Sequence, residues 1–108
     1  LTPDPQPEQN LFTRSDHYSF VRQGVPSLFI KPGFASGGQA ADRGFRSTHY
    51  HKVSDDLTRP INWRSGARFA EFNYRIARAV ADAPAPPLWY AGSYFGTTFA
   101  KDRPKARR

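Results

Sequence analysis

The chain has 108 residues, enough for one modest core, and its lack of cysteine excludes disulfides, thiolate zinc sites and cysteine nucleophiles. The formal charge is +7, but the last eight residues hold five cations and one aspartate, and no aromatic residue there could stack on bases. We therefore do not expect nucleic-acid binding. We also expect no membrane span, because no apolar run approaches the roughly 20 residues that one requires.

The first 30 residues predict a connector, a short helix and a strand. Residues 1–11 contain three prolines and little to bury, so they should run extended over a surface. In RSDHYSFVRQG, Ser15 or Asp16 can cap a short helix that Gly24 would end. Residues 25–30, VPSLFI, form a nearly continuous apolar run, which is typical of a strand covered on both faces. The sequence thus predicts an α/β sheet.

The rest of the chain predicts a long loop, a long helix and two terminal segments. Residues 31–46 are rich in glycine and alanine without periodicity, so we expect a long loop that is functional or disordered. Residues 62–82 carry one charged stripe on an otherwise apolar surface, which predicts a helix. Residues 84–100 form a proline and aromatic segment expected to return as a lid or packing arm. Residues 101–108 form a basic tail expected to be solvated.

The segment 47–57, STHYHKVSDDL, has the densest set of metal-capable groups in the chain. His49 and His51 would point to one side of an extended segment, whereas His51 and Asp55 would share a face only in a helix. Three interpretations stay open: a hydrogen-bonded turn leading into the helix, a self-contained zinc site, or part of a site completed by other sequence. A self-contained site lacks a general base, because both glutamates are poorly placed.

The residues from about Phe12 to Ala83 resemble the carboxyl-terminal part of the dizinc aminopeptidases. That family includes secreted bacterial leucine aminopeptidases and relatives such as glutamate carboxypeptidase and glutaminyl cyclase. The resemblance rests on RSDHYSFVRQGVPSLFI, a glycine-rich loop, YHKVSDDL and a long closing helix, in the family's order and spacing. It implies that residues 12–83 are the carboxyl-terminal part of a three-layer α/β/α zinc-peptidase catalytic domain.

The resemblance also implies roles for five residues. His51 matches the family's last zinc ligand, and Tyr50 matches a position that in some members donates a hydrogen bond to the tetrahedral intermediate. Arg14 matches an arginine that in some members contacts substrate or product. Asp16 and Asp55 match aspartates expected beside the metal ligands. His49 has no counterpart and is assigned no role, and His17 is expected to pack or cap rather than to bind metal.

The family's remaining ligands to its two zinc ions, and the Glu–Glu pair that supplies its base, precede the matched region and have no candidate in residues 1–12. This absence, the Leu1 start and the lack of methionine indicate a fragment of a larger peptidase. We expect it to need the remainder of the same catalytic domain and a peptide substrate, to be inactive alone, and to be secreted or periplasmic. The alternative is a noncatalytic interaction module or a metal-free relative of the family.

Overall fold

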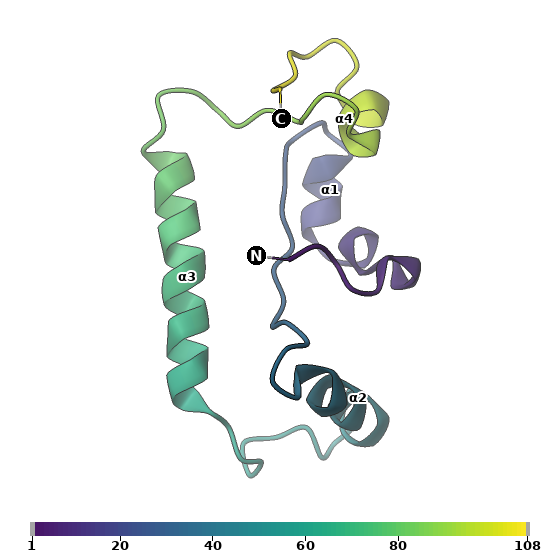
Figure 1. Ribbon diagram of the computed structural model, residues 1–108, viewed down its shortest axis with the longest axis vertical. Coiled ribbons are helices and arrows are strands. Elements are labelled where there is room, and N and C mark those ends of the chain that lie inside the picture. The colour runs from purple at the N-terminus through teal and green to yellow at the C-terminus, as the bar shows by residue number, and fades with distance from the viewer. Residues whose placement is uncertain (1, 108) are drawn as a thin grey trace. The chain divides into compact units, whose positions relative to one another are not determined.

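The computed structural model describes residues 2–107, and within this range every regular element is a helix (Figure 1). The elements in order are η1 (Pro7–Gln9), η2 (Leu11–Arg14), α1 (His17–Val21), α2 (Gly38–Thr48), α3 (Trp63–Ala81) and α4 (Tyr94–Phe99). The only β contact in the described range is an isolated parallel bridge between Tyr90 and Ala106. The predicted α/β fold class, with its buried strand in a three-layer domain, is therefore wrong.

The apolar run VPSLFI is not a strand because it has neither a partner nor cover. A strand needs a neighbour to satisfy its backbone groups, and no other extended segment in the described range pairs with residues 25–30. Val25, Leu28 and Phe29 are 40%, 54% and 41% exposed. Pro26 also lacks the N–H that a ladder requires. The apolar pattern described the residue types correctly but not the backbone that they adopt.

The predicted loop over residues 31–46 contains most of a helix, α2. Gly37 has a left-handed backbone (φ +85°) at the N-cap, and the helix follows with the good helix formers Gln39, Ala40 and Ala41. An ion pair between Asp42 and Arg46, four residues apart, adds local support. Phe45 is the one large apolar residue in this helix and two of its residues are glycines, so its composition is typical of a loop.

The long helix predicted over residues 62–82 is confirmed as α3. Asn62 begins it, and the side-chain oxygen of Asn62 accepts a hydrogen bond from the Ser65 amide at 2.9 Å. Glu71 pairs with Arg75 at 2.7 Å. The apolar face remains open within the described chain, since its large side chains are substantially exposed: Trp63 69%, Phe69 38%, Phe72 37%, Tyr74 56% and Val80 47%.

The chain divides into two compact units, each described here by itself. One unit holds the residues up to Lys31 together with those from Ala85 onward, and the other spans Pro32–Pro84. The first unit therefore joins the two ends of the sequence. Its core contains Val21, which is fully buried, and Ala100, which is 4% exposed.

Rings from both ends of the sequence surround this small core. The Phe95 ring lies 4.9 Å from Phe12 and 6.1 Å from Tyr18, measured between ring centroids. The His17 ring stacks on Phe29 at 5.3 Å and meets the edge of Phe12 at 4.6 Å. His17 is therefore a packing residue, as expected, although its Nε2 atom is buried without a hydrogen-bond partner.

Candidate functional site

The five predicted site residues are distributed over both units. Arg14 and Asp16 lie in the first unit, at the end of η2 and at the position before α1. Tyr50, His51 and Asp55 lie in the second unit, in the irregular segment between α2 and α3. The structure thus provides two groups of candidate residues, and each group is described within its own unit.

Tyr50 and His51 form a stacked pair at the end of α2. Their ring centroids are 3.8 Å apart with an angle of 22° between the planes. The edge of the Phe45 ring contacts Tyr50, with the centroids 5.9 Å apart. Tyr50 is 43% exposed, so one side of the ring packs while the other part remains accessible to solvent. Contacts with His51 and Phe45 therefore hold the Tyr50 side chain in place, and its exposed part remains accessible to a ligand.

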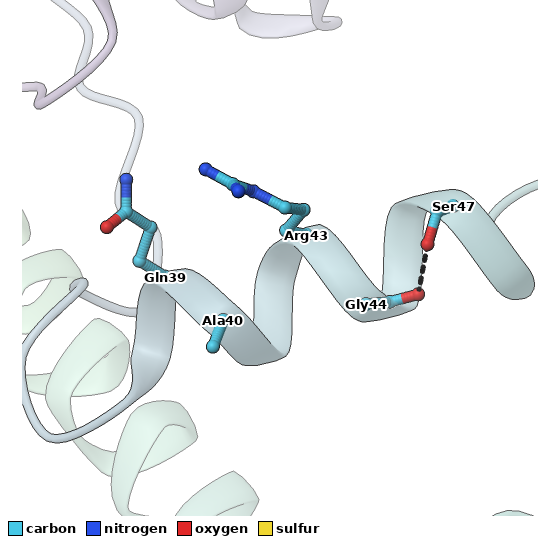
Figure 2. A pocket seen from close by; sticks show the side chains of 5 residues that line it. All are labelled: Gln39, Ala40, Arg43, Gly44 and Ser47. Carbon is cyan, nitrogen blue, oxygen red and sulfur yellow. Dashed lines mark hydrogen bonds between the residues drawn. The ribbon is translucent and has the colours of Figure 1, made fainter.

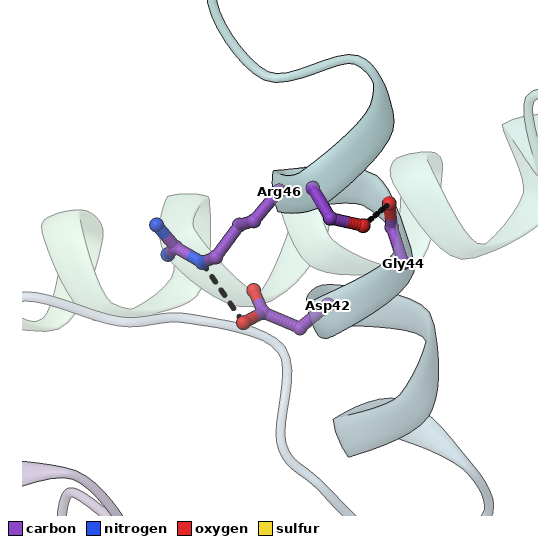
Figure 3. Close-up of polar contacts among 4 residues, drawn as sticks. Asp42, Gly44 and Arg46 are labelled. Atoms are coloured by element: carbon purple, nitrogen blue, oxygen red, sulfur yellow. Dashed lines mark hydrogen bonds and ion pairs between the residues drawn. The ribbon is translucent and has the colours of Figure 1, made fainter.

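α2 supplies a cation to the same cluster. The Arg46 guanidinium lies 5.3 Å from the centre of the Tyr50 ring, within the usual range of a cation–π contact. Arg46 Nε is also 2.9 Å from Asp42 Oδ2, so the carboxylate fixes the guanidinium from the preceding turn (Figure 3). Sequence reasoning missed Phe45 and Arg46 because it placed them in a loop. The spacing of Asp42 and Arg46 was the signal that could have found them.

Arg59 extends this cluster from the chain that follows the histidine segment. Its guanidinium lies 5.1 Å from the centre of the Phe45 ring. The ring of Phe45 therefore contacts Arg59 as well as Tyr50. Arg59 Nη1 is buried without a hydrogen-bond partner in the described chain. The segment between α2 and α3 is thus folded back onto α2 through the contact between Arg59 and Phe45.

The backbone and the ring of His51 are both unusual. His51 has a φ of +58°, in the left-handed region that residues other than glycine rarely occupy, although histidine is among those that tolerate it best. Its side chain is exposed, and within residues 2–107 no hydrogen bond engages either ring nitrogen. Residues other than glycine with a left-handed backbone occur in turns and also cluster at functional sites.

His49 differs from His51 because its ring is already engaged. His49 Nδ1 lies 3.0 Å from the Ser54 hydroxyl, across the turn that contains His51. The amide of Lys52 donates to the His49 carbonyl at 2.9 Å, which tightens the same turn. His49 therefore stabilises the turn locally, and its role in the structure is separate from that of His51.

The two aspartates of the segment also differ. Asp55 is exposed, and only its backbone is engaged, by donation from its amide to the Lys52 carbonyl at 3.0 Å. Asp56 accepts hydrogen bonds from the Thr58 hydroxyl at 2.6 Å and from the Thr58 amide at 2.8 Å. Both bonds lower the pKa of Asp56 below its usual value of 3.8, and the bond from the Thr58 hydroxyl has the larger effect. Neither aspartate caps α3, which begins at Trp63.

In the first unit, the segment from Arg14 to Asp16 is an exposed corner between η2 and α1. Both Arg14 and Asp16 are exposed. Asp16 occupies the N-cap position of α1, but its side chain accepts no capping hydrogen bond. Neither side chain forms an ion pair within residues 2–107. Arg14 and Asp16 therefore keep their charges available for a ligand.

A hollow of about 380 Å³ lies on one side of α2 (Figure 2). It is lined by Gln39, Ala40, Arg43, Gly44 and Ser47, which recur along one face of the helix. Ser47 donates to the Gly44 carbonyl, so its hydroxyl is already engaged. None of the five predicted site residues lines this hollow. The candidate residues are therefore the stacked pair in one unit and the exposed corner in the other, and neither group belongs to this pocket.

Within residues 2–107, no group of three or more histidine or acidic side chains lies close enough to hold a metal ion. His51 therefore offers one ligand atom without companions from the described chain. No helix in the same range is long and apolar enough to cross a membrane.

Comparison with known proteins identifies the family. The model of peptidase family M28 matches residues 1–77, more than half of the chain and including all five candidate residues. No curated protein and no solved structure gives a significant match. The family match confirms the resemblance to the dizinc aminopeptidases that the two sequence motifs indicated. The chain therefore belongs to peptidase family M28.

Proposed function

We propose that this chain is the carboxyl-terminal part of a zinc aminopeptidase that removes amino-terminal residues from peptides. The observation that carries the proposal is the stacked Tyr50–His51 pair, in which an exposed imidazole with unengaged nitrogens lies directly beside an ordered phenol. The pair falls within the residues that match the peptidase family. A metal ligand and a hydrogen-bond donor that lie side by side are suited to the hydrolysis of an amide by a metal-activated water.

His51 fits the role of a zinc ligand by its chemistry and its surroundings. A neutral imidazole nitrogen is a preferred zinc donor, and the ring of His51 is exposed and not committed to another partner. A bound zinc ion would supply an activated water at neutral pH. Because the described residues provide no further ligand beside His51, the remaining ligands and the general base would come from the remainder of the same catalytic domain. The chain alone is therefore expected to be inactive.

Tyr50 suits the role of a donor to the oxygen that becomes negative as the scissile carbonyl is attacked. Its ring is fixed by His51 on one side and by Phe45 and Arg46 on others, so its hydroxyl is preorganised before substrate binds. The Arg46 guanidinium contacts the ring and is paired with Asp42 at 2.9 Å, so it serves to orient the ring. The preorganised hydroxyl favours the charged transition state over the neutral substrate.

Arg14, Asp16 and Asp55 would act on the substrate and on the surroundings of the metal. Arg14 is exposed and unpaired, as a residue that contacts a substrate or product carboxylate must be. Asp16 and Asp55 are exposed carboxylates whose side chains make no hydrogen bond in the described chain. We assign both to positions beside the metal ligands, where a carboxylate can orient a ligating imidazole.

The apolar face of α3 supports the proposal that the remainder of the domain packs against this chain. Trp63 is 69% exposed and Tyr74 is 56% exposed, and both lie on a helix that has no large apolar partner in its own unit. Exposed aromatic groups on one long helix are costly in water and mark a contact surface. The partner expected here is the amino-terminal part of the same peptidase.

The substitution Tyr50→Phe tests the hydrolytic role, because it keeps the ring and its stacking while deleting only the hydroxyl. In the complete peptidase we expect kcat for an aminoacyl amide to fall by about 10²–10³, the usual loss for one oxyanion donor. KM and zinc content should change little, because the contact forms mainly in the transition state. A kcat within about threefold of wild type would show that Tyr50 has only a packing role.

A further inference from the structure

The segment after α3 returns to the beginning of the chain and binds the end of α1. We call residues 85–107 the C-terminal arm. Trp89 Nε1 donates to the Gly24 carbonyl at 3.1 Å, and the Arg103 guanidinium donates to the carbonyls of Gly24 at 3.4 Å and Gln23 at 3.3 Å. Gln23 and Gly24 form the turn that follows α1, which ends at Val21, and a carbonyl in such a turn needs a partner from elsewhere in the chain. A guanidinium and an indole supply those partners and hold the turn after α1.

The same arm also holds the beginning of α1. Phe95 contacts Phe12, which precedes Arg14 by two residues, and Tyr18, which follows Asp16 by two residues. One ring from the arm thus touches the chain on both sides of the exposed corner. The corner itself remains free, since Arg14 and Asp16 are exposed. The contacts fix the chain around the corner without covering it.

The C-terminal arm is itself a closed loop. The Ala91 amide donates to the Ala106 carbonyl at 2.8 Å, and the Ala106 amide donates to the Trp89 carbonyl at 2.9 Å. Lys105 Nζ donates to the Ala100 carbonyl just after α4. A side chain at Gly96 would place its Cβ 2.6 Å from the Trp89 Cβ, so only glycine allows this close packing. Trp89, Phe95 and Arg103 are therefore presented by a cross-linked loop and not by a free tail.

We propose that the C-terminal arm positions the corner at Arg14 and Asp16 for substrate binding, with Arg103 and Trp89 holding the end of α1 and Phe95 holding its beginning. This inference rests on the proposed function, since it assigns Arg14 to the substrate. The arm lies beyond residue 77, where the match to the peptidase family ends. Arg103 acts through the backbone of α1 and is a positioning residue.

Arg103 and Lys101 provide a matched pair of variants. Both side chains are exposed and both carry one positive charge, but only Arg103 donates to α1, and Lys101 makes no hydrogen bond or ion pair within residues 2–107. Arg103→Ala and Lys101→Ala therefore change the net charge equally. Any difference between the two variants reports the contacts to Gln23 and Gly24 and not the charge of the arm.

The experiment compares these variants in the complete peptidase. For Arg103→Ala we expect KM for a peptide substrate to rise roughly threefold to tenfold, the effect of losing about one net hydrogen bond, with kcat and zinc content unchanged. Amide hydrogen exchange in residues 21–25 should become faster in the same variant. Lys101→Ala should match wild type in every measurement, and Arg103→Lys should recover part of the KM, because a lysine ammonium can still donate to the carbonyls of Gln23 and Gly24.

Several results would overturn the inference. Unchanged hydrogen exchange in Arg103→Ala would show that Arg103 does not hold α1. Faster exchange with an unchanged KM would show that the arm stabilises α1 without positioning a substrate residue. A joint fall of kcat and zinc content would indicate a general folding defect and would also contradict a positioning role. A complete wild-type enzyme without peptidase activity would instead overturn the proposed function, and this inference with it.

Discussion

At the scale of single residues, the histidine segment separates groups that hold the turn from groups that are free to react. His49 is bound to Ser54, and Asp56 is bound to Thr58, so both serve the local structure. His51 and Asp55 have no such side-chain partner in the described chain. The segment therefore combines two kinds of polar residue: those that hold the turn, and those whose side chains have no hydrogen-bond partner in the described chain.

The pKa of Asp56 provides a test of this local structure. Because the Thr58 hydroxyl is the main cause of the lowered pKa, Thr58→Val should raise the pKa of Asp56 toward 3.8, while Thr58→Ser should leave it low. The change can be followed by NMR titration of the Asp56 carboxyl carbon. An Asp56 pKa that is the same in both variants would show that the hydroxyl does not bind this carboxylate.

The sign of the corresponding stability effect follows from the direction of the shift. The folded state holds the Asp56 proton less tightly than the unfolded state, so this group contributes stability that is fully present above about pH 3.8. The contribution is lost as the pH falls through the lower pKa of the folded state. Because Asp56 is fully exposed, the effect should be confined to acid conditions and should be weakened by salt.

At the scale of elements, Gly24 is the position where the ends of α1 and α4 meet. It has a left-handed φ of +80°, and a Cβ there would lie 2.7 Å from the Phe99 carbonyl oxygen and 3.3 Å from the Ala100 Cβ. Gly37, before α2, has a similar φ of +85° but has nothing within 4 Å of such a Cβ. The two glycines share the same backbone requirement and differ in their packing.

This difference predicts unequal costs for the same substitution. Gly37→Ala should lower the free energy of unfolding by about 1–2 kcal/mol, the cost of a left-handed backbone for alanine. Gly24→Ala should lower the free energy of unfolding by the same amount and by about 1–3 kcal/mol more, because the added methyl group collides with backbone that cannot easily move. Chemical denaturation of the complete peptidase measures both. Equal losses in the two variants would show that the C-terminal arm does not pack against Gly24.

The elements also show which features of the fold the sequence could reveal. α3 was predictable because a charged stripe with a helical period runs along its whole length and because Asn62 can cap the helix. α2 was overlooked because Phe45 is its one large apolar residue and because Gly38 and Gly44 lie within it, a composition that is typical of a loop. The run VPSLFI was misjudged because an apolar composition cannot by itself provide the neighbouring strand that a sheet needs.

At the scale of the whole molecule, the contacts that matter most connect residues far apart in the sequence. Trp89 and Arg103 bind a carbonyl 65 and 79 residues earlier, respectively, and no local pattern could predict either contact. The basic composition of the tail predicts solvated side chains, and Arg103 is exposed, but Arg103 and Lys105 also donate to backbone carbonyls. The five candidate residues were found differently, through motifs that resemble a family, and their roles stay predictions.

The central claim is that His51, and not His49, is a ligand of the zinc that the peptidase uses. The most direct measurement is the zinc content of the complete enzyme carrying His51→Ala or His49→Ala, determined together with its activity. We expect His51→Ala to lose zinc and nearly all activity, because three or four ligands hold such an ion and each is required. His49→Ala should keep both, since its ring binds only Ser54. Equal losses in the two variants, or full zinc content in His51→Ala, would contradict the account.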